Sequence, residues 1–403
     1  MPCILIDLVG ENYTLEDALT QTLGSKLTDW EKLYDCENPN LSLGDRFYKL
    51  LSAAHSKTGR RCVVLVDEYD KPLLEVMDRA ALLDKNKQIF KSFFSVLKSA
   101  DEHIAFTFIT GVTKFSKVSL FSDLNNLNDI SLQKKYADIC GITEEEMLSY
   151  FQTEIGELAE EQSLTSDECI KALKAQYDGY HFHPAAVGVY NPFSLLQAFF
   201  SKEFGAYWFA TGTPTFLVKK LKELEFDVHM LTDNILTVIK DDLENYRGDN
   251  DDPIPLLYQA GYLTIVGLNR KTGEYTLAFP NEEVSYGFLR CLLPEYAPRF
   301  VSTSSANIFS LRKHIAAGNL EGIKNILVAL FAGITYPTKH SPFEHYFQAV
   351  IFIVFKLLGQ YTICEQHSAT GRIDCTLETD DYIYLFEFKR DSTAKEALAQ
   401  IEA

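Results

Sequence analysis

The stretch Gly371–Lys389 has the sequence GRIDCTLETDDYIYLFEFK. Apolar residues alternate with polar residues over 372–378, 382–386 is a continuous hydrophobic run, and the acidic segment 378–381 separates the two halves. The alternation and the short hydrophobic run each predict a strand, and the short turn between them predicts an antiparallel hairpin. Glu387 and Lys389 lie two positions apart on the second strand, so their side chains share a face with apolar neighbours.

The hairpin is part of a longer pattern. The apolar run 343–358 predicts a helix, 361–366 predicts a further strand, and a second helix is expected from Thr393 onward. The order of a helix, three strands and a helix predicts a small α/β domain in this part of the chain.

Three charged residues of the hairpin indicate a chemistry. Asp374 lies on the first predicted strand, and we expect the hairpin to bring it beside Glu387. Charges beside hydrophobic neighbours are costly without a partner, and two carboxylates offer the oxygen ligands that Mg²⁺ prefers. A metal would activate a water, and Lys389 would orient that water or stabilise charge on a phosphate. The pattern predicts phosphodiester hydrolysis that depends on Mg²⁺ or Mn²⁺.

The segments 371–374 and 386–389 resemble the D…(E)xK signature of the PD-(D/E)XK nuclease superfamily, with Ile373 in place of the usual proline. By the same resemblance, Glu344 matches an acidic residue that adds a metal contact, and Gln400 matches a polar residue of the last helix. The resemblance implies a restriction-endonuclease-like αβββα domain. It also implies two sets of site residues: the metal ligands Glu344, Asp374 and Glu387, and the catalytic residues Asp374, Glu387, Lys389 and Gln400.

The alternative interpretation of the hairpin is structural. Glu387 and Lys389 would then form an ion pair on an edge strand, and Asp374 would be a surface acid. An isolated ExK triplet favours that interpretation, because such short motifs often match by chance. Five matching positions in the expected order favour the nuclease fold.

In the amino-terminal part, short apolar runs alternate with helical stretches. The runs 4–9, 62–66 and 104–109 predict strands, and 15–27 and 87–99 predict helices. This alternation predicts a mostly parallel sheet covered by helices.

The second of these strands ends in Asp67 and Glu68. An apolar strand with two terminal acids has the form of a Walker B element, in which the Asp positions Mg²⁺ and the Glu polarises the attacking water. The extension of this strand through 67–74 is more distinctive. Together with three other segments, it resembles a bacterial AAA-ATPase-like family whose members carry a PD-(D/E)XK domain. Those other segments are 108–115, 177–182 and 207–214.

The sequence contains no GxxxxGK[ST] motif. The backbone amides and the lysine of that loop hold the β- and γ-phosphates of a nucleotide. In the family the loop precedes the strand that corresponds to 4–9, so we expect a truncated P-loop domain in which Asp67 and Glu68 are remnants. ATP hydrolysis is not expected of this chain alone, although another subunit or a partner chain could supply the loop.

The middle of the chain is expected to be helical over 143–222. A helix at 254–259, followed by two short strands, resembles a winged-helix module. The sequence therefore predicts four domains: an AAA-ATPase-like α/β domain (1–142), a helical lid or adaptor (143–227), a winged-helix-like module (228–301) and a PD-(D/E)XK nuclease-like domain (307–403).

The composition of the chain bears on its binding partners and on its location in the cell. The net charge of -18 argues against broad attraction to phosphate backbones. Eight cysteines without a CxxC pair indicate neither zinc nor a disulfide framework, which fits a reducing cytoplasm. Neither a signal peptide nor an apolar run of about 20 residues is recognisable, so we expect a cytoplasmic location and no membrane partner.

The sequence thus predicts a Mg²⁺-dependent nuclease that acts on DNA or RNA and is attached to a degenerate AAA-ATPase-like domain. The alternative function is a non-catalytic nucleic-acid-binding or regulatory protein in which both domains are relics. The acidic charge and the missing loop support that alternative, and the intact set of Asp374, Glu387 and Lys389 counts against it.

Overall fold

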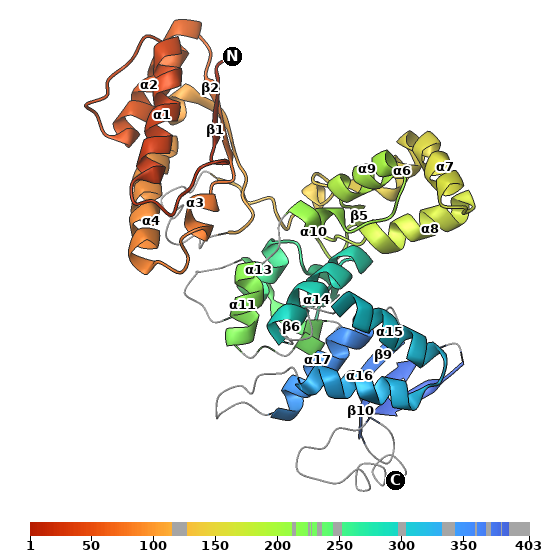
Figure 1. Cartoon of the computed structure of the whole chain (residues 1–403). Helices are drawn as coiled ribbons and strands as arrows, with labels where there is room; N and C mark the ends of the chain where they lie inside the picture. The colour runs from red at the N-terminus through yellow and green to blue at the C-terminus, as the bar shows by residue number, and fades with distance from the viewer. Residues whose placement is uncertain are drawn as a thin grey trace. The chain divides into compact units, whose positions relative to one another are not determined.

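The structure is a computed structural model of the 403-residue chain (Figure 1). It divides into two compact units, one formed by 1–130 with 239–260 and the other by 131–238 with 261–403. The described residues are 1–114, 127–211, 215–224, 226, 228–231, 236–244, 252–296, 304–332, 343–358, 361–367, 372–379 and 381–386.

The first unit is built on a parallel sheet, as predicted. Its strands are β1 (Cys3–Asp7), β2 (Cys62–Asp67) and β3 (Ile104–Ile109), in the order β1-β2-β3. Their Val and Ile residues favour extended backbone. Alternate residues face the helices, so that Ile4 and Val64 are fully buried.

Two long helices cover one face of this sheet, α1 (Ala18–Leu33) and α2 (Leu43–Thr58) (Figure 1). The Ser42 side chain caps the start of α2, and Gly59 ends it with a left-handed φ of 67°. The remaining elements of the unit are α3 (Lys71–Leu74), α4 (Ala80–Phe94), α5 (Val96–Ser99), the 3-10 helix η1 (Asp101–His103), α12 (Lys240–Glu244) and α13 (Ile254–Gln259).

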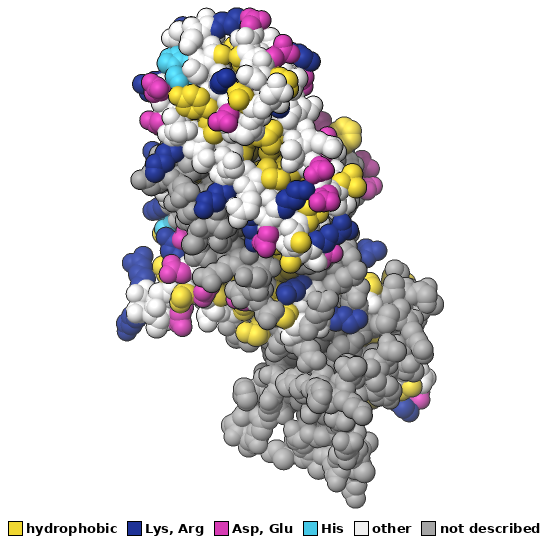
Figure 2. All heavy atoms as spheres, turned by 90° about the vertical axis from the view of Figure 1, so that its left-hand side faces the viewer, with side chains coloured by type: hydrophobic (Ala, Val, Ile, Leu, Met, Phe, Trp, Pro, Cys, Tyr) yellow, Lys and Arg dark blue, Asp and Glu magenta, His cyan; other side chains and the backbone are white. Residues whose placement is uncertain are grey.

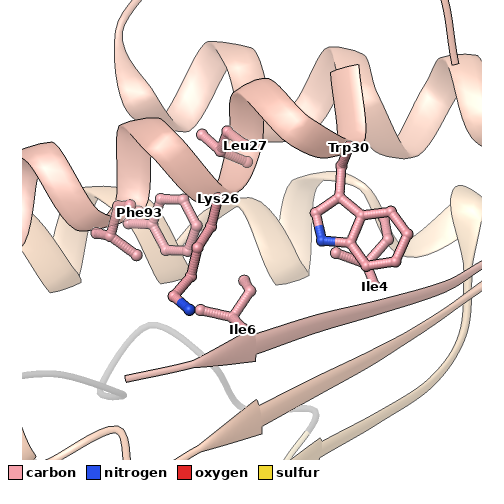
Figure 3. Close-up of a pocket in the computed structure, with 7 residues that line it drawn as sticks. Ile4, Ile6, Lys26, Leu27, Trp30 and Phe93 are labelled. Atoms are coloured by element: carbon pink, nitrogen blue, oxygen red, sulfur yellow. The ribbon is translucent and has the colours of Figure 1, made fainter. Parts of the chain in front are cut away.

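Apolar side chains fill the space between α1 and the sheet (Figure 3). Trp30 and the stem of Lys26 point from α1 toward the strands (Figure 3), and together with Leu27, Ile4 and Ile6 they line a small apolar pocket. Ile4 is 0% and Ile6 is 2% exposed. Full burial of a side chain of this kind contributes roughly 1.5–3 kcal/mol, so this contact anchors α1.

A buried ion pair joins α1 to α2. Arg46 donates from Nε and from one terminal nitrogen to the two carboxylate oxygens of Glu31, at 2.9 and 2.8 Å. The same terminal nitrogen donates to the Gly24 carbonyl and the Thr28 hydroxyl. Because the guanidinium is paired and hydrogen-bonded, its burial does not leave an isolated charge.

The opposite face of the sheet is apolar and exposed. Leu5, Phe106 and Phe108 are 47%, 55% and 38% exposed, and the two phenylalanine rings stack with centroids 6.2 Å apart. Parallel sheets are usually covered on both faces. Within the described part of this unit, α1 and α2 contact the strands from the other face.

The second unit begins with a helical part, as predicted for this region. Its core includes Leu158, Leu173, Tyr177, Leu195 and Phe199. The elements up to the middle of the unit are η2 (Lys134–Tyr136), β4 (Ile142–Thr143), α6 (Glu144–Tyr150), α7 (Gln152–Glu161), α8 (Ser166–Tyr177), β5 (Val189–Tyr190), α9 (Pro192–Ser201), α10 (Tyr207–Thr211), α11 (Thr215–Glu223) and η3 (Val228–Leu231).

A buried carboxylate links three helices of this unit. Glu283, in the first turn of α14 (Glu282–Tyr296), is 0% exposed. Its Oε1 accepts from the Ser194 hydroxyl on α9 at 2.9 Å and from the Trp208 backbone N–H on α10 at 2.8 Å. Nearby in the unit, Gly179 has a φ of 101°, and a Cβ there would lie 2.0 Å from the Pro280 carbonyl oxygen. Two of the segments that carry the family resemblance therefore pack against the region that begins α14.

A three-stranded sheet follows in the order β6-β8-β7. β7 (Thr264–Asn269) and β8 (Glu274–Ala278) form the predicted antiparallel hairpin, and β6 (Leu236–Ile239) pairs with β8. The helix predicted before the hairpin is α13, which clusters with the first unit. The winged-helix-like arrangement stays a prediction.

The last part of the second unit contains α15 (Ser304–Ala316), α16 (Leu320–Ala332) and α17 (Phe343–Leu357), followed by β9 (Tyr361–His367), β10 (Arg372–Glu378) and β11 (Ile383–Phe386). The six consecutive residues 350–355 of α17 are all 0% exposed. A helix that is apolar on every side is expected to be buried, and α17 packs against α14, β9 and β10.

Charged side chains of both signs are interspersed on the face of the first unit that Figure 2 shows. Among the residues that the structure describes, no helix is both long and apolar enough to cross a membrane.

Candidate functional site

The carboxyl-terminal hairpin is present as predicted. β10 and β11 pair antiparallel, with Cys375 opposite Phe386 and Leu377 opposite Tyr384. β9 pairs antiparallel with the other edge of β10, so that β10, which carries Asp374, is the central strand in the order β11-β10-β9. A central strand is held on both edges, which fixes the position of its backbone.

Only some of the predicted nuclease residues lie in the part of the chain that the structure describes. Glu344 lies in the first turn of α17 and Asp374 lies on β10, but the side chains of both are outside the described part. Glu387, Lys389 and Gln400 lie outside the described residues. Since α17 packs against β9 and β10, the structure brings the helix with Glu344 against the strands with Asp374.

The two faces of β11 differ in exposure. Tyr384 is 8% exposed and donates its hydroxyl to the Ile315 carbonyl at 2.6 Å, and the Phe386 ring lies 4.9 Å from the ring of Phe355 on α17. Ile383 and Leu385, on the other face, are 67% and 42% exposed. Thr376, which lies opposite Leu385 on β10, is 9% exposed, so this face is open at β11 and covered at β10 among its described residues.

A second set of polar residues lies at the carboxyl edge of the parallel sheet in the first unit. Asp67 ends β2, and its Oδ1 accepts from the Thr110 hydroxyl just beyond β3 and from the Glu68 backbone N–H at 3.1 Å. Glu68 has a left-handed φ of 49°, which is unusual for a residue with a side chain. Burial raises the pKa of the Glu68 carboxyl, although Lys71, 3.9 Å away, opposes that shift.

Asp70 holds the loops after β2 and β3 together. It is 0% exposed and accepts from the Val112 N–H at 3.1 Å and from both the N–H and the hydroxyl of Thr113. Burial raises the pKa of Asp70, and these hydrogen bonds partly offset that effect. A Cβ on Gly111 would lie 2.5 Å from Asp70 Oδ1 and 2.7 Å from the Tyr69 ring, so only glycine fits there.

Sequence reasoning singled out Asp67 and Glu68 but did not assign roles to Thr110 and Asp70. A signal was available for Thr110. The carboxyl ends of neighbouring parallel strands meet at one edge of a sheet, so the residue after β3 is expected beside the residue that ends β2. Within the described part of the chain, no group of three or more His, Cys, Asp or Glu side chains is arranged to hold a metal ion.

Comparison with known proteins shows the family to which the chain belongs. Residues 1–121 match the family model described as "Predicted AAA-ATPase", and residues 342–403 match that of the PD-(D/E)XK nuclease superfamily. An uncharacterized protein in the vnfD 5' region of Azotobacter chroococcum mcd 1 is 37% identical over 372 residues, which cover 89% of this chain and 68% of that protein. No solved structure matches the chain. The chain therefore belongs to the family of AAA-ATPase-like proteins that carry a PD-(D/E)XK nuclease superfamily domain at their carboxyl end.

Proposed function

We propose that the chain hydrolyses phosphodiester bonds of DNA or RNA in its carboxyl-terminal domain, with Mg²⁺ or Mn²⁺ as cofactor. The match of residues 342–403 to the nuclease superfamily supports this function at the level of the domain. The residue-level proposal depends on Asp374, Glu387 and Lys389.

The observation that carries the proposal is the register of the hairpin. Cys375 lies opposite Phe386, and the next residues outward are Asp374 on one strand and Glu387 on the other. If the same register extends by one step, Asp374 and Glu387 are a directly opposite pair. Opposite side chains of an antiparallel pair lie on the same face with Cβ atoms about 4.5–5.5 Å apart, which suits two ligands of one ion.

Each residue then has a distinct role. Asp374 and Glu387 hold the ion with their carboxylates, and Glu344 adds a contact from α17. Lys389 stabilises negative charge on the phosphate or orients the attacking water, and Gln400 assists from the last helix. When bound, Mg²⁺ supplies a Lewis acid that neutralises charge on the phosphate and makes a coordinated water more acidic. The exposed Ile383 and Leu385 leave room for a polymer on this face.

The test is a cleavage assay on single- and double-stranded DNA and RNA with Mg²⁺ or Mn²⁺. Wild type is compared with Glu387→Ala and Lys389→Ala, each expected to lower the cleavage rate by about 10²–10³-fold, the effect of losing one transition-state stabiliser. Glu378→Gln is the matched control, because Glu378 is an exposed acid at the far end of β10 and should keep wild-type cleavage. Cleavage that survives both substitutions would refute the assignment.

The main rival is a non-catalytic protein that binds nucleic acid or regulates other proteins. The net charge of -18 supports it. The two functions separate in the same assay. Nucleic-acid binding without cleavage by wild type, under conditions where the protein is folded, favours the rival.

For the first unit, we infer that Asp67 and Glu68 form an element of the Walker B type. The hydrogen bond from the Thr110 hydroxyl to Asp67 supports a role at the carboxyl edge of the sheet. The printed sequence contains no GxxxxGK[ST] motif, and we expect no ATP turnover by this chain alone. ATP turnover that disappears in Glu68→Gln would overturn this expectation.

A further inference from the structure

Two histidines meet at the opposite, amino-terminal end of strand β3. His55 lies in the last turn of α2, and His103 ends η1, immediately before β3. Their Nδ1 atoms are 3.0 Å apart, and the ring planes are inclined by 67°. Neither histidine takes part in the two sites described above.

The position of the His103 ring is defined by its contacts. Tyr48, two helical turns before His55 on α2, contacts the His103 ring edge to face, with centroids 5.8 Å apart. The His103 side chain is 14% exposed, and its Nε2 lies 3.8 Å from a carboxylate oxygen of Glu102. The contact with Tyr48 packs the His103 ring in the position where its Nδ1 atom lies beside His55.

From this geometry we infer that His55 and His103 form a binding site for a divalent transition-metal ion that takes imidazole ligands in cis positions, as Ni²⁺ and Cu²⁺ do. Two ligands at about 2.1 Å from an ion and at about 90° to each other are separated by about 3.0 Å. The observed separation of the Nδ1 atoms matches that arrangement. A tetrahedral ion such as Zn²⁺ needs a separation of about 3.4 Å, so it fits less well.

The two imidazoles can change from a hydrogen-bonded pair to a pair of metal ligands by moving one proton. In the metal-free pair, one ring must donate its Nδ1–H to the Nδ1 of the other. For metal binding, that proton moves from Nδ1 to Nε2 of the same ring. Both rings are then neutral with a free Nδ1 lone pair, and no proton is released to the solvent. The Nε2 atom of His103 then carries the proton, on the side of the ring where a carboxylate oxygen of Glu102 lies 3.8 Å away.

The protein supplies only part of the coordination of this ion. Two imidazoles come from the protein, and water ligands would complete the coordination. Among the described residues, no group of three or more His, Cys, Asp or Glu side chains is arranged to hold an ion. Because the two histidines come from α2 and from the segment before β3, an ion bound here joins two elements of the first unit. An ion that binds the folded state and not the unfolded state raises the melting temperature of the protein through mass action.

The test uses the chelator-stripped full chain and measures Ni²⁺ affinity by calorimetry and Cu²⁺ coordination by electron paramagnetic resonance. Wild type is expected to bind one Ni²⁺ at this site and to show nitrogen hyperfine coupling from two imidazoles with Cu²⁺. His55→Ala and His103→Ala should each weaken this binding by at least about tenfold and remove one nitrogen from the spectrum. Mg²⁺, which prefers oxygen ligands, should not compete.

Three variants distinguish this site from metal binding elsewhere in the chain. Tyr48→Phe keeps both imidazoles and the aromatic contact, so it should retain Ni²⁺ binding. His183→Ala removes a histidine of the second unit, and Glu387→Ala removes a proposed ligand of the nuclease site, so both should also retain it. Equal Ni²⁺ affinity in wild type, His55→Ala and His103→Ala would show that the pair is a hydrogen bond only and would overturn the inference. Loss of binding in Glu387→Ala alone would overturn it as well, because the ion would then belong to the nuclease site.

Discussion

Cys375 on β10 lies directly opposite Phe386 on β11. This pair is the last described step of a register whose continuation places Asp374 opposite Glu387. The proposed metal site depends on that continuation, which can be tested without measuring catalysis.

Cysteines at 374 and 387 are expected to form a disulfide under mild oxidation. Directly opposite residues have Cα atoms about 4.5–5.5 Å apart, within the range that a disulfide spans. The experiment uses a background in which Cys364 and Cys375, themselves opposite on β9 and β10, are serine. Mass spectrometry detects the cross-link. Preferential cross-linking of the pair 374 and 388 would show a shifted register and would exclude the proposed geometry.

Glu31→Ala is expected to destabilise the first unit by about 3–5 kcal/mol, because it leaves the buried Arg46 guanidinium without its carboxylate. Urea unfolding followed by Trp30 fluorescence, in a Trp208→Phe background, measures the change in the first unit. Asp35→Asn is the control, since the Lys57–Asp35 pair is exposed and should matter little. Equal effects of the two substitutions would contradict the role of burial.

Gly111→Ala should destabilise the first unit by about 1–3 kcal/mol, because the added Cβ overlaps Asp70 Oδ1 and the Tyr69 ring. Gly156→Ala is the matched control. Gly156 lies within α7 and has no atom within 4 Å of an added Cβ, so alanine there should stabilise the helix by about 1 kcal/mol. Thermal unfolding of both variants shows whether their changes in stability relative to wild type have opposite signs.

The stability of the second unit should depend on pH through Glu283. Burial raises the pKa of this carboxyl above its ordinary value of 4.5. For a raised pKa, the stabilising contribution is fully present below the unfolded-state pKa and is lost as the pH rises through the folded-state value. The free energy of unfolding of wild type, relative to Glu283→Gln, should therefore fall as the pH rises above 4.5.

Urea unfolding from pH 4 to about 8, followed by Trp208 fluorescence in a Trp30→Phe background, gives this difference. The backbone N–H of Trp208 donates to Glu283, so its fluorescence reports on the same region. Glu282→Gln is the control, because Glu282 is the exposed neighbour on the same helix turn. A difference between wild type and Glu283→Gln that stays constant with pH would contradict the prediction.

Sequence patterns were sufficient wherever a structure depends on neighbours along the chain. The alternation in the first half of 371–389, the hydrophobic run in the second half and the acidic segment between them predicted β10, β11 and their turn, and the apolar run before them predicted α17. The ordered positions from Glu344 to Lys389 also identified the family, which the family models confirm. The roles of Glu387, Lys389 and Gln400 stay predictions, because these residues lie outside the described part.

The tertiary structure alone decided which distant residues meet. Thr110 lies 43 residues from Asp67, His103 lies 48 from His55, and Glu283 lies 89 from Ser194. Local periodicity determines which face of an element is apolar, but not which other element packs against that face. It also did not reveal that Ile383 and Leu385 are exposed while Tyr384 is buried. That choice depends on the packing of α17 and α15 against the hairpin, which arises only when the whole unit folds.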